Sequence, residues 1–484
     1  MHPVPRLFAC LVVLVVVSLA SAGGQQPAGT SLAITSVTII DVSAATEEAA
    51  IQTDRTVIIR AGRISDVGNS STTAVPADAR RIDGRGKYLI PGLWDMHVHV
   101  LSPRREAFLP LLIANGVTGV RDMATAFGPD EIARVRQRIA DGSLVGPRMF
   151  VAGPLLSGGS AARSGPGRIA HGWTVTTSDE ARGAVATLIG ERVDFLKVYS
   201  YLKRDVFVAI VENARANKID IAGHVPIPVP IVDAVRAGLR SIEHGTGLTL
   251  ACSSKESELR NEAVSVMATG DVLRARRVAD GDSHDTIDDA KCAAVLDRLG
   301  REEVWHTPTV VFFDAISKFA RGDPPDPAMR YVPPSARTAP DGTAWADRMK
   351  PLIGPRSVDA GARNLAMLRR LHRAHARVLA GTDLGNPFLI PGVSLHDELE
   401  HLVAAGFSPL QALQSATLEP ARFLRREADI GTIEPGRIAD LVLLDANPLE
   451  EIRRARQIRA VVAGGRLFDR AALDGILAAL EKTP

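Results

Sequence analysis

Between residues 88 and 383, short apolar runs alternate with segments whose apolar residues recur at helical spacing. Segments such as 181–189 and 231–237 have the periodicity of amphipathic helices, whereas the apolar runs have the length of buried strands. Strands that alternate with helices predict a parallel sheet. The predicted strands lie near residues 88–97, 117–122, 147–153, 193–199, 219–224, 239–244, 303–309 and 377–383. Eight such units predict an α/β fold, a (β/α)8 TIM barrel.

The two chain ends have a different pattern. Residues 31–40 and 55–60 near the start, and 439–444 and 458–467 near the end, resemble strands, with turns at Ala61-Gly62 and Gly464-Gly465. Neither end has enough strands to cover both faces of a sheet. We therefore expect residues 23–90 and 430–484 to form one composite β-sandwich domain beside a barrel of residues 91–429.

Polar residues that can bind a metal stand where several of these strands end. His97 and His99 lie two residues apart, so a strand would point both imidazoles to one side, and imidazole is a common zinc ligand. The remaining candidates each follow an apolar run: Lys197, His224, His244 and Asp383. Active sites of TIM barrels lie at the carboxyl ends of the strands, so the pattern predicts one metal site.

These residues carry a resemblance to the amidohydrolase superfamily. It rests on the run Pro91–His99, on Lys197, His224 and His244, and on Ala380–Asp383; the stretch Ile430–Val442 resembles the end segment of the family. Within the superfamily the chain is most similar to the imidazolonepropionase-related, prolidase-like branch. The stretches Asp194–Tyr199 and Ser241–Thr246 resemble its binuclear, lysine-bridged group.

The resemblance implies a metal centre with a modified lysine. Lys197 would react with carbon dioxide to form N6-carboxylysine, a step that needs the neutral amine favoured by burial. His97, His99 and Asp383 would then hold one metal, His224 and His244 the other, with Lys197 shared. Nitrogen and oxygen ligands suit two Zn²⁺ ions, although manganese, cobalt and iron also fit. The alternative for Lys197 is a salt bridge to an acidic neighbour inside the barrel.

This centre predicts hydrolysis of an amide C–N bond. A water between two metals has a lowered pKa, and Asp383 stands where it can move its proton to the leaving amine. Tyr199 would share the face of Lys197 and could donate to an oxyanion or bind a substrate carboxylate; the alternative is an aromatic residue on the barrel rim. His171, in the Gly- and Ser-rich segment 157–172, either touches substrate or is a solvated loop histidine.

Dipeptides or N-acyl amino acids are the expected substrates, as in prolidases. The alternatives are a cyclic amide, as in imidazolonepropionase, a lactone or a phosphoester, and a non-catalytic binding protein on the same scaffold. A mononuclear cyclic-amide enzyme would have no use for Lys197, and a binding protein would be expected to have lost metal ligands. The fold alone does not decide among them.

The chain start resembles a secretory signal peptide. Residues 7–20 are apolar and Ala20-Ser21-Ala22 fits a cleavage site, so residues 1–22 would be removed and the protein exported to the periplasm or beyond; an uncleaved anchor is the alternative. The mature chain would keep Cys252 and Cys292, which either form a disulfide in an oxidising compartment or stay as buried thiols.

Two insertions and the charge complete the prediction. Residues 251–301 are polar with helical spacing, and the proline-rich residues 321–356 are expected to form a loop over the barrel mouth, such as a lid. A formal net charge of +2 gives no support for nucleic-acid or membrane-surface binding. The expected partner is a small-molecule or peptide-like substrate, with a homo-oligomer as the default assembly.

Overall fold

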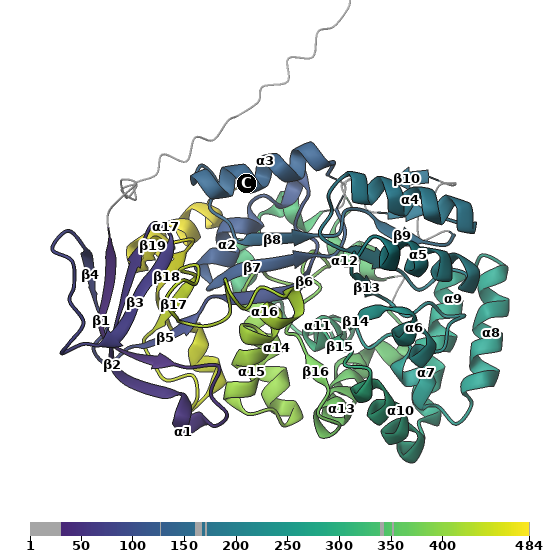
Figure 1. Cartoon of the computed structure of the whole chain (residues 1–484). Helices are drawn as coiled ribbons and strands as arrows, with labels where there is room; N and C mark the ends of the chain where they lie inside the picture. The colour runs from purple at the N-terminus through teal and green to yellow at the C-terminus, as the bar shows by residue number, and fades with distance from the viewer. Residues whose placement is uncertain are drawn as a thin grey trace, which may run out of the picture.

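The computed structural model describes residues 31–125, 127–159, 167–169, 172–338, 343–350 and 353–483. Strands from both chain ends pair in one eight-stranded sheet, in the order β19-β18-β17-β5-β1-β2-β3, with β4 beside β1. They are β1 (Leu32–Ile40), β2 (Ile51–Arg60), β3 (Arg63–Asn69), β4 (Arg80–Asp83), β5 (Tyr88–Pro91), β17 (Leu441–Leu444), β18 (Ile458–Ala463) and β19 (Arg466–Asp469). This sheet lies at the left in Figure 1.

The pairing of β5 with β17 joins the two chain ends. The pair is antiparallel, with Leu441 opposite Pro91. The β2–β3 hairpin turns at Ala61 and Gly62, whose φ values of 48° and 77° are those of a type I′ turn. In the described residues, the strands of the two ends belong to one hydrogen-bonded sheet.

The predicted strand at 88–97 is wrong in one respect, because it is two strands. β5 belongs to the sheet of the chain ends, whereas β6 (Leu93–Val98) pairs with β7 (Val117–Asp122). Gly92 separates them, and a Cβ atom there would lie 2.0 Å from Oγ1 of Thr118. The chain can therefore change sheets at this position only with a residue that lacks a side chain.

The strands that match the predicted ones pair in parallel and follow the predicted order with shorter bounds. β6, β7 and β8 (Arg148–Val151) form one sheet, and β9 (Leu155–Ser157), β12, β13, β14, β15 and β16 follow in another, with the short pair β10 (Gly167–Ile169) and β11 (Gly172–Thr174) at its edge. β9, β10 and β11 are additional to the predicted strands, and β10 pairs antiparallel with β11. The strands are β12 (Leu196–Val198), β13 (Ile221–Gly223), β14 (Leu239–Glu243), β15 (Trp305–Thr307) and β16 (Arg377–Val378). Backbone hydrogen bonds also link residue 380 to Met96 and residue 383 to His97.

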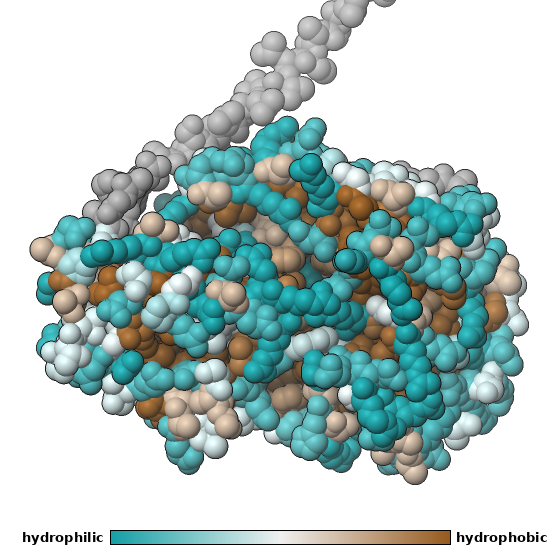
Figure 2. Space-filling view, in the orientation of Figure 1, coloured by the Kyte–Doolittle hydropathy of each residue, from teal (hydrophilic) through white to brown (hydrophobic). Residues whose placement is uncertain are grey.

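Amphipathic helices cover these strands and share one hydrophobic core with them. Apolar positions three and four residues apart face that core, as in α5, where Phe207, Ile210 and Val211 are buried. The helices outside the insertions are α1 (Glu47–Ala50), α2 (Phe108–Ala114), α3 (Pro129–Asp141), α4 (Ser178–Gly190), α5 (Arg204–Ala216), α6 (Ile231–Ala237), α11 (Val310–Arg321), α13 (Ala360–Arg373), α14 (Val393–Ala405), α15 (Pro409–Ser415), α16 (Leu418–Leu424) and α17 (Arg470–Glu481). In Figure 2 the visible surface is mostly hydrophilic, and hydrophobic residues show mainly in recesses between elements.

The insertion after β14 is helical, as predicted. It contains α7 (Leu248–Cys252), α8 (Glu256–Ala268), α9 (Val272–Arg276), a π-helix (Arg277–Gly281) and α10 (Asp289–Arg301). A disulfide joins Cys252 to Cys292 and so fastens the start of the insertion to its last helix.

The second insertion differs from the predicted loop. Where it is described, it forms 3₁₀ turns at Pro327–Tyr331 and Pro334–Arg337 and the short helix α12 (Trp345–Met349). Prolines at the first helical positions favour such short helices, because their missing N–H needs no partner there. Buried Val332 and Trp345 hold the segment against the core. Within the described part of the chain, no helix is both long and apolar enough to span a membrane.

Candidate metal centre

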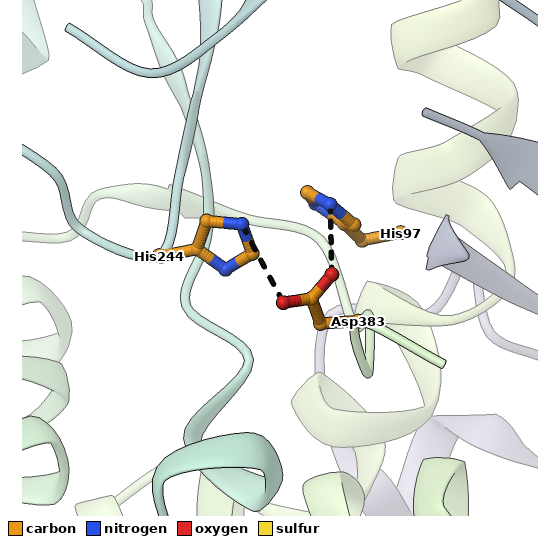
Figure 3. Close-up of side chains that lie close together, drawn as sticks. All are labelled: His97, His244 and Asp383. Atoms are coloured by element: carbon orange, nitrogen blue, oxygen red, sulfur yellow. Dashed lines mark ion pairs between the residues drawn. The ribbon is translucent and has the colours of Figure 1, made fainter. Parts of the chain in front are cut away.

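Four predicted ligands from distant parts of the chain meet at the carboxyl ends of the strands. Oδ1 of Asp383 lies 3.3 Å from Nε2 of His97 and 3.3 Å from Nε2 of His99. The other oxygen of Asp383, Oδ2, lies 3.9 Å from Nε2 of His244. Figure 3 shows the imidazoles of His97 and His244 turned toward this one carboxylate. One carboxylate thus lies close to three histidines.

In His97 and His99, the hydrogen bond is made by Nδ1, so Nε2 of each ring is available to bind a metal. Nδ1 of His97 lies 2.7 Å from Oε2 of Glu243, and Nδ1 of His99 lies 3.3 Å from the carbonyl oxygen of Ala124. A carboxylate and a carbonyl only accept hydrogen bonds, so Nδ1 carries the proton in both rings and Nε2 keeps its lone pair. Such partners fix the orientation of metal-binding histidines in proteins.

In His224 and His244, which directly follow β13 and β14, Nδ1 is hydrogen-bonded to a hydroxyl group. Nδ1 of His244 lies 2.8 Å from Oγ1 of Thr309, and Nδ1 of His224 lies 2.8 Å from Oγ of Ser200. A hydroxyl can accept the Nδ1 proton, which again leaves Nε2 as a free donor of electrons to a metal. Thr309 and Ser200 have no candidate role in the sequence pattern.

Two of the candidate ligands occupy an unusual backbone conformation. His244 has a φ of 59° and Asp383 a φ of 65°, values that cost energy for residues other than glycine and that cluster at functional sites. Neighbouring Gly381 gives the chain room there, because a Cβ would lie 2.5 Å from Cγ2 of Thr307 and 2.9 Å from the His97 nitrogen. The backbone is therefore bent to aim these side chains inward.

Lys197 lies beside this cluster in the middle of β12. Its side chain is fully buried, and Nζ has no hydrogen-bond partner within the described chain. Burial lowers the pKa of Lys197 to about 8, which raises the fraction of neutral amine at neutral pH. No salt bridge to Lys197 is found among the described residues, so the alternative drawn from the sequence lacks a partner there.

The protonation of the other candidates suits metal binding. Burial, followed by the charge of Lys197, lowers the pKa of His97 and of His224 well below the ordinary value; burial also lowers the pKa of His244. Burial alone would raise the pKa of Asp383, but His244 and His99 outweigh it and the net direction is down. The imidazoles of His97, His224 and His244 are therefore neutral and the carboxylate of Asp383 ionised at neutral pH, the states that ligands need.

A buried ion pair beneath the histidines was not anticipated from the sequence. Nη2 of Arg121, on β7, lies 2.8 and 2.9 Å from the two carboxylate oxygens of Glu243, and both side chains are fully buried. Ser241 donates to the same carboxylate at 2.5 Å. A charged residue inside the apolar run Val117–Asp122 was the available signal for Arg121, because charges are rarely buried without a partner.

The remaining predicted residues fall in different places. Tyr199 packs beside His224, with ring centroids 4.2 Å apart, so it lies next to the cluster on the side of Lys197. His171 lies outside the described residues. His306, which has no predicted role, is buried in the middle of β15, and its Nδ1 has no hydrogen-bond partner in the described chain.

The residues present fit a divalent metal site. Nε2 of His97 and Nζ of Lys197 are buried polar atoms without a hydrogen-bond partner in the part of the chain that is described, and such atoms are costly unless a ligand engages them. Neutral imidazoles and a carboxylate, without thiolate, form a donor set suited to zinc and related ions.

Comparison with known proteins points to one family. Residues 88–468 match the amidohydrolase family. The chain is 24% identical over 93% of its length to an adenine deaminase of Rubrobacter xylanophilus, of which it spans only 59%. It is 22% identical to an imidazolonepropionase of Symbiobacterium thermophilum, over 82% of this chain and 85% of that protein. A solved prolidase in complex with N-methylphosphonate-L-proline superposes with a TM-score of 0.65 at 22% identity, covering 91% of this chain and all of the other.

Proposed function

Because the chain belongs to the amidohydrolase family, whose members are hydrolases that act on C–N bonds, we propose that it is a metal-dependent hydrolase of dipeptides or N-acyl amino acids. The observation that carries the proposal is the cluster of His97, His99 and His244 around Asp383, with His224 beside His244. Next to it lies the buried Lys197, which has no hydrogen-bond partner among the described residues. We also propose that the parallel strands form a closed (β/α)8 barrel, residues 91–429, beside a β-sandwich of residues 23–90 and 430–484.

In this proposal the ligands divide into two sets. His97, His99 and Asp383 would hold one divalent ion and His224 and His244 a second, with Lys197, as N6-carboxylysine, shared; Zn²⁺ is the first choice. When bound, such ions lower the pKa of a bound water and polarise a carbonyl oxygen. The first set is supported by one oxygen of Asp383, Oδ1, which lies 3.3 Å from Nε2 of both His97 and His99.

The side chains of the protein would then transfer protons and bind the substrate. The Asp383 carboxylate, ionised because its pKa is lowered, would accept a proton on an oxygen and return it to the leaving amine nitrogen. The Tyr199 phenol beside His224 would donate a hydrogen bond to the substrate. Arg121 and Glu243 would hold His97 in place from below.

Two alternative reactions use the same residues. A cyclic amide, as in imidazolonepropionase, or a lactone or phosphoester also presents an electrophile to an activated water. The buried Lys197 without a salt-bridge partner in the described chain favours the lysine-bridged centre, for which a mononuclear cyclic-amide enzyme has no use. The complete set of ligands disfavours a non-catalytic binding protein.

Metal content measured together with hydrolysis tests the proposal. Wild-type protein purified without added metal is expected to carry two metals per chain. The Lys197→Ala variant is expected to lose the metals and to stop hydrolysing a panel of dipeptides and N-acyl amino acids. Lys203→Ala, which changes an exposed lysine six residues away, is the matched control. One metal per chain, unaffected by Lys197→Ala, would contradict the lysine bridge and favour the mononuclear alternative.

We propose in addition that residues 1–22 direct the protein to the periplasm or out of the cell. The disulfide between Cys252 and Cys292 supports an oxidising compartment. Sequencing the N-terminus of the protein recovered from the periplasm or the medium should find Gly23 as the first residue. A protein retained in the cytoplasm with its first residues intact would contradict this assignment.

A further inference from the structure

The insertion between β14 and β15 folds back onto the strand ends beside the metal cluster. Ala275 of α9 and Val278 of the π-helix share a hydrophobic cluster with Tyr201, and Tyr199 packs against that cluster. Figure 1 shows α9 and α8 beside α6 and α7 at the end of the molecule opposite the sheet of the chain ends. Arg276 follows Ala275 in α9, and its guanidinium interacts electrostatically with Tyr199 and Tyr201.

Arg276 differs from the other arginines of this segment. Arg274 and Arg277 are exposed, whereas Arg276 is half-buried with 33% of its side chain accessible. Its hydrogen bond to Asp280 runs from Nε to Oδ2 at 3.4 Å; within the described chain Arg276 has no other hydrogen bond to a carboxylate. A guanidinium offers five N–H donors in a planar fork. Arg276 therefore has N–H groups that remain accessible to a ligand next to the candidate metal centre.

The charge of Arg276 reaches the residues of the proposed metal centre. After burial and nearer charges, Arg276 contributes to the lowered pKa of both Lys197 and His224. Asp280, which also accepts from the backbone N–H of Gly247, ties Arg276 to the loop that follows His244. The guanidinium is thus held at a defined position beside the cluster, on the side of Tyr199.

We propose that Arg276 is a specificity-determining residue that binds the free carboxylate of the amino acid on the leaving side of the scissile bond. This inference rests on the proposed function and deepens it, because it selects substrates that end in a free α-carboxylate. In a dipeptide or an N-acyl amino acid this carboxylate lies one carbon from the amide nitrogen. An arginine beside the hydrolytic centre can therefore bind it, and the fork geometry of guanidinium matches a carboxylate with two parallel hydrogen bonds.

The residues around Arg276 agree with this assignment. Tyr199 and Tyr201 interact electrostatically with the guanidinium and carry phenol groups that can donate to a substrate. Asp280 balances the charge of Arg276 when no substrate is present. A long, partly accessible ion pair can exchange its partner for a substrate carboxylate at small cost, since exposed pairs contribute little free energy. The insertion, rather than the barrel strands, would then define which substrates are accepted.

Paired substrates test the inference. Hydrolysis of N-acyl amino acids is compared with hydrolysis of the same compounds capped as C-terminal carboxamides. Arg276→Gln is expected to lower kcat/KM for the free acids by about 10- to 100-fold, mainly through KM, because a charge-assisted contact is lost. The carboxamides should change little, and Arg276→Lys should restore part of the preference. The matched control is Arg277→Gln, which changes an exposed neighbour on the same turn.

A binding measurement separates this inference from the proposed function. Calorimetry with N-methylphosphonate-L-proline and its carboxamide, on metal-loaded protein, needs no turnover. Tighter binding of the acid, lost in Arg276→Gln but kept in Arg277→Gln, supports the inference even if no dipeptide or N-acyl amino acid is hydrolysed, an outcome that would refute the proposed function alone. Equal binding of acid and carboxamide by the wild type, or equal losses for both in Arg276→Gln, would overturn the role of Arg276.

Discussion

Two arginine–carboxylate pairs flank the candidate centre, and they differ in almost every physical respect. Arg121 and Glu243, beneath the histidines, are both fully buried and 2.8 Å apart. Arg276 and Asp280, on the insertion, are each 33% accessible and 3.4 Å apart. We call the first pair, with Lys197 and His97, the floor, and the second, with Tyr199 and Tyr201, the rim.

The difference in burial suggests that the two pairs have different roles, one in holding the metal ligands and one in selecting the substrate. Buried charges such as those of the floor keep one geometry, because leaving either partner unpaired in a dry interior is expensive. An accessible pair such as that of the rim is weak and can exchange partners. We infer that the floor fixes the histidines that would bind metal, and that the rim decides which substrate is held. Variants that disturb one region should therefore leave the readout of the other nearly unchanged.

Glu243→Gln should have the largest effect. The amide oxygen can still accept from Nδ1 of His97, but the carboxylate that holds this ring is lost, and partners of this kind are typically worth about 10- to 100-fold in metal affinity. Arg121 would also remain as a buried charge without its partner, at a cost of about 3–5 kcal/mol of folding free energy. Metal titration and thermal unfolding of the variant measure the two effects.

A double variant distinguishes the loss of metal from the loss of stability. Arg121→Met combined with Glu243→Gln removes the buried charge, so stability should recover while metal affinity stays low. Glu212→Gln, at an exposed position of α5, is the matched control for the single change. Recovery of metal affinity in the double variant would mean that Glu243 acts only by neutralising Arg121, and the positioning role would be wrong.

The pH dependence of metal loading tests the role of Lys197 in the floor. Burial lowers the pKa of Lys197 to about 8, so the neutral amine that reacts with carbon dioxide rises from about 10% at pH 7 to about 90% at pH 9. Metal-depleted protein given Zn²⁺ at a fixed concentration of dissolved carbon dioxide should therefore regain metal up to about ninefold faster at pH 9 than at pH 7. The rate is followed by the metal bound per chain after gel filtration.

Loading without carbon dioxide provides the contrast. Wild-type protein should then reach a lower metal content at either pH, and Lys197→Ala should show no response to carbon dioxide. A rate that stays constant between pH 7 and pH 9 would contradict a carbamate formed on a titrating lysine. Substrate preference should follow none of these changes, because Arg276 keeps its charge throughout this range.

The floor and the rim also differ in how far the sequence predicts them. The parallel strands and their polar last residues are local patterns, so His97, His99, Lys197, His224, His244 and Asp383 could be selected from the sequence. The division of 88–97 into two strands depends on the packing of Gly92 against Thr118, which no local pattern encodes. Arg276 is one of several arginines in a polar helical stretch, and only the packing of that stretch on Tyr201 distinguishes it.

Removing the disulfide should have the smallest effect, and this effect should be confined to the rim. Cys252 and Cys292 lie 40 residues apart in sequence and fasten the insertion that carries Arg276; a loop of this length is worth about 4 kcal/mol or less in the chain-entropy account. In Cys252→Ala/Cys292→Ala, the looser insertion should raise KM for free acids less than tenfold, below about 1.4 kcal/mol. Metal content should stay at the wild-type value, because no metal candidate lies in the insertion. A parallel loss of metal would show that the floor depends on the insertion, and the division into a holding floor and a selecting rim would then fail.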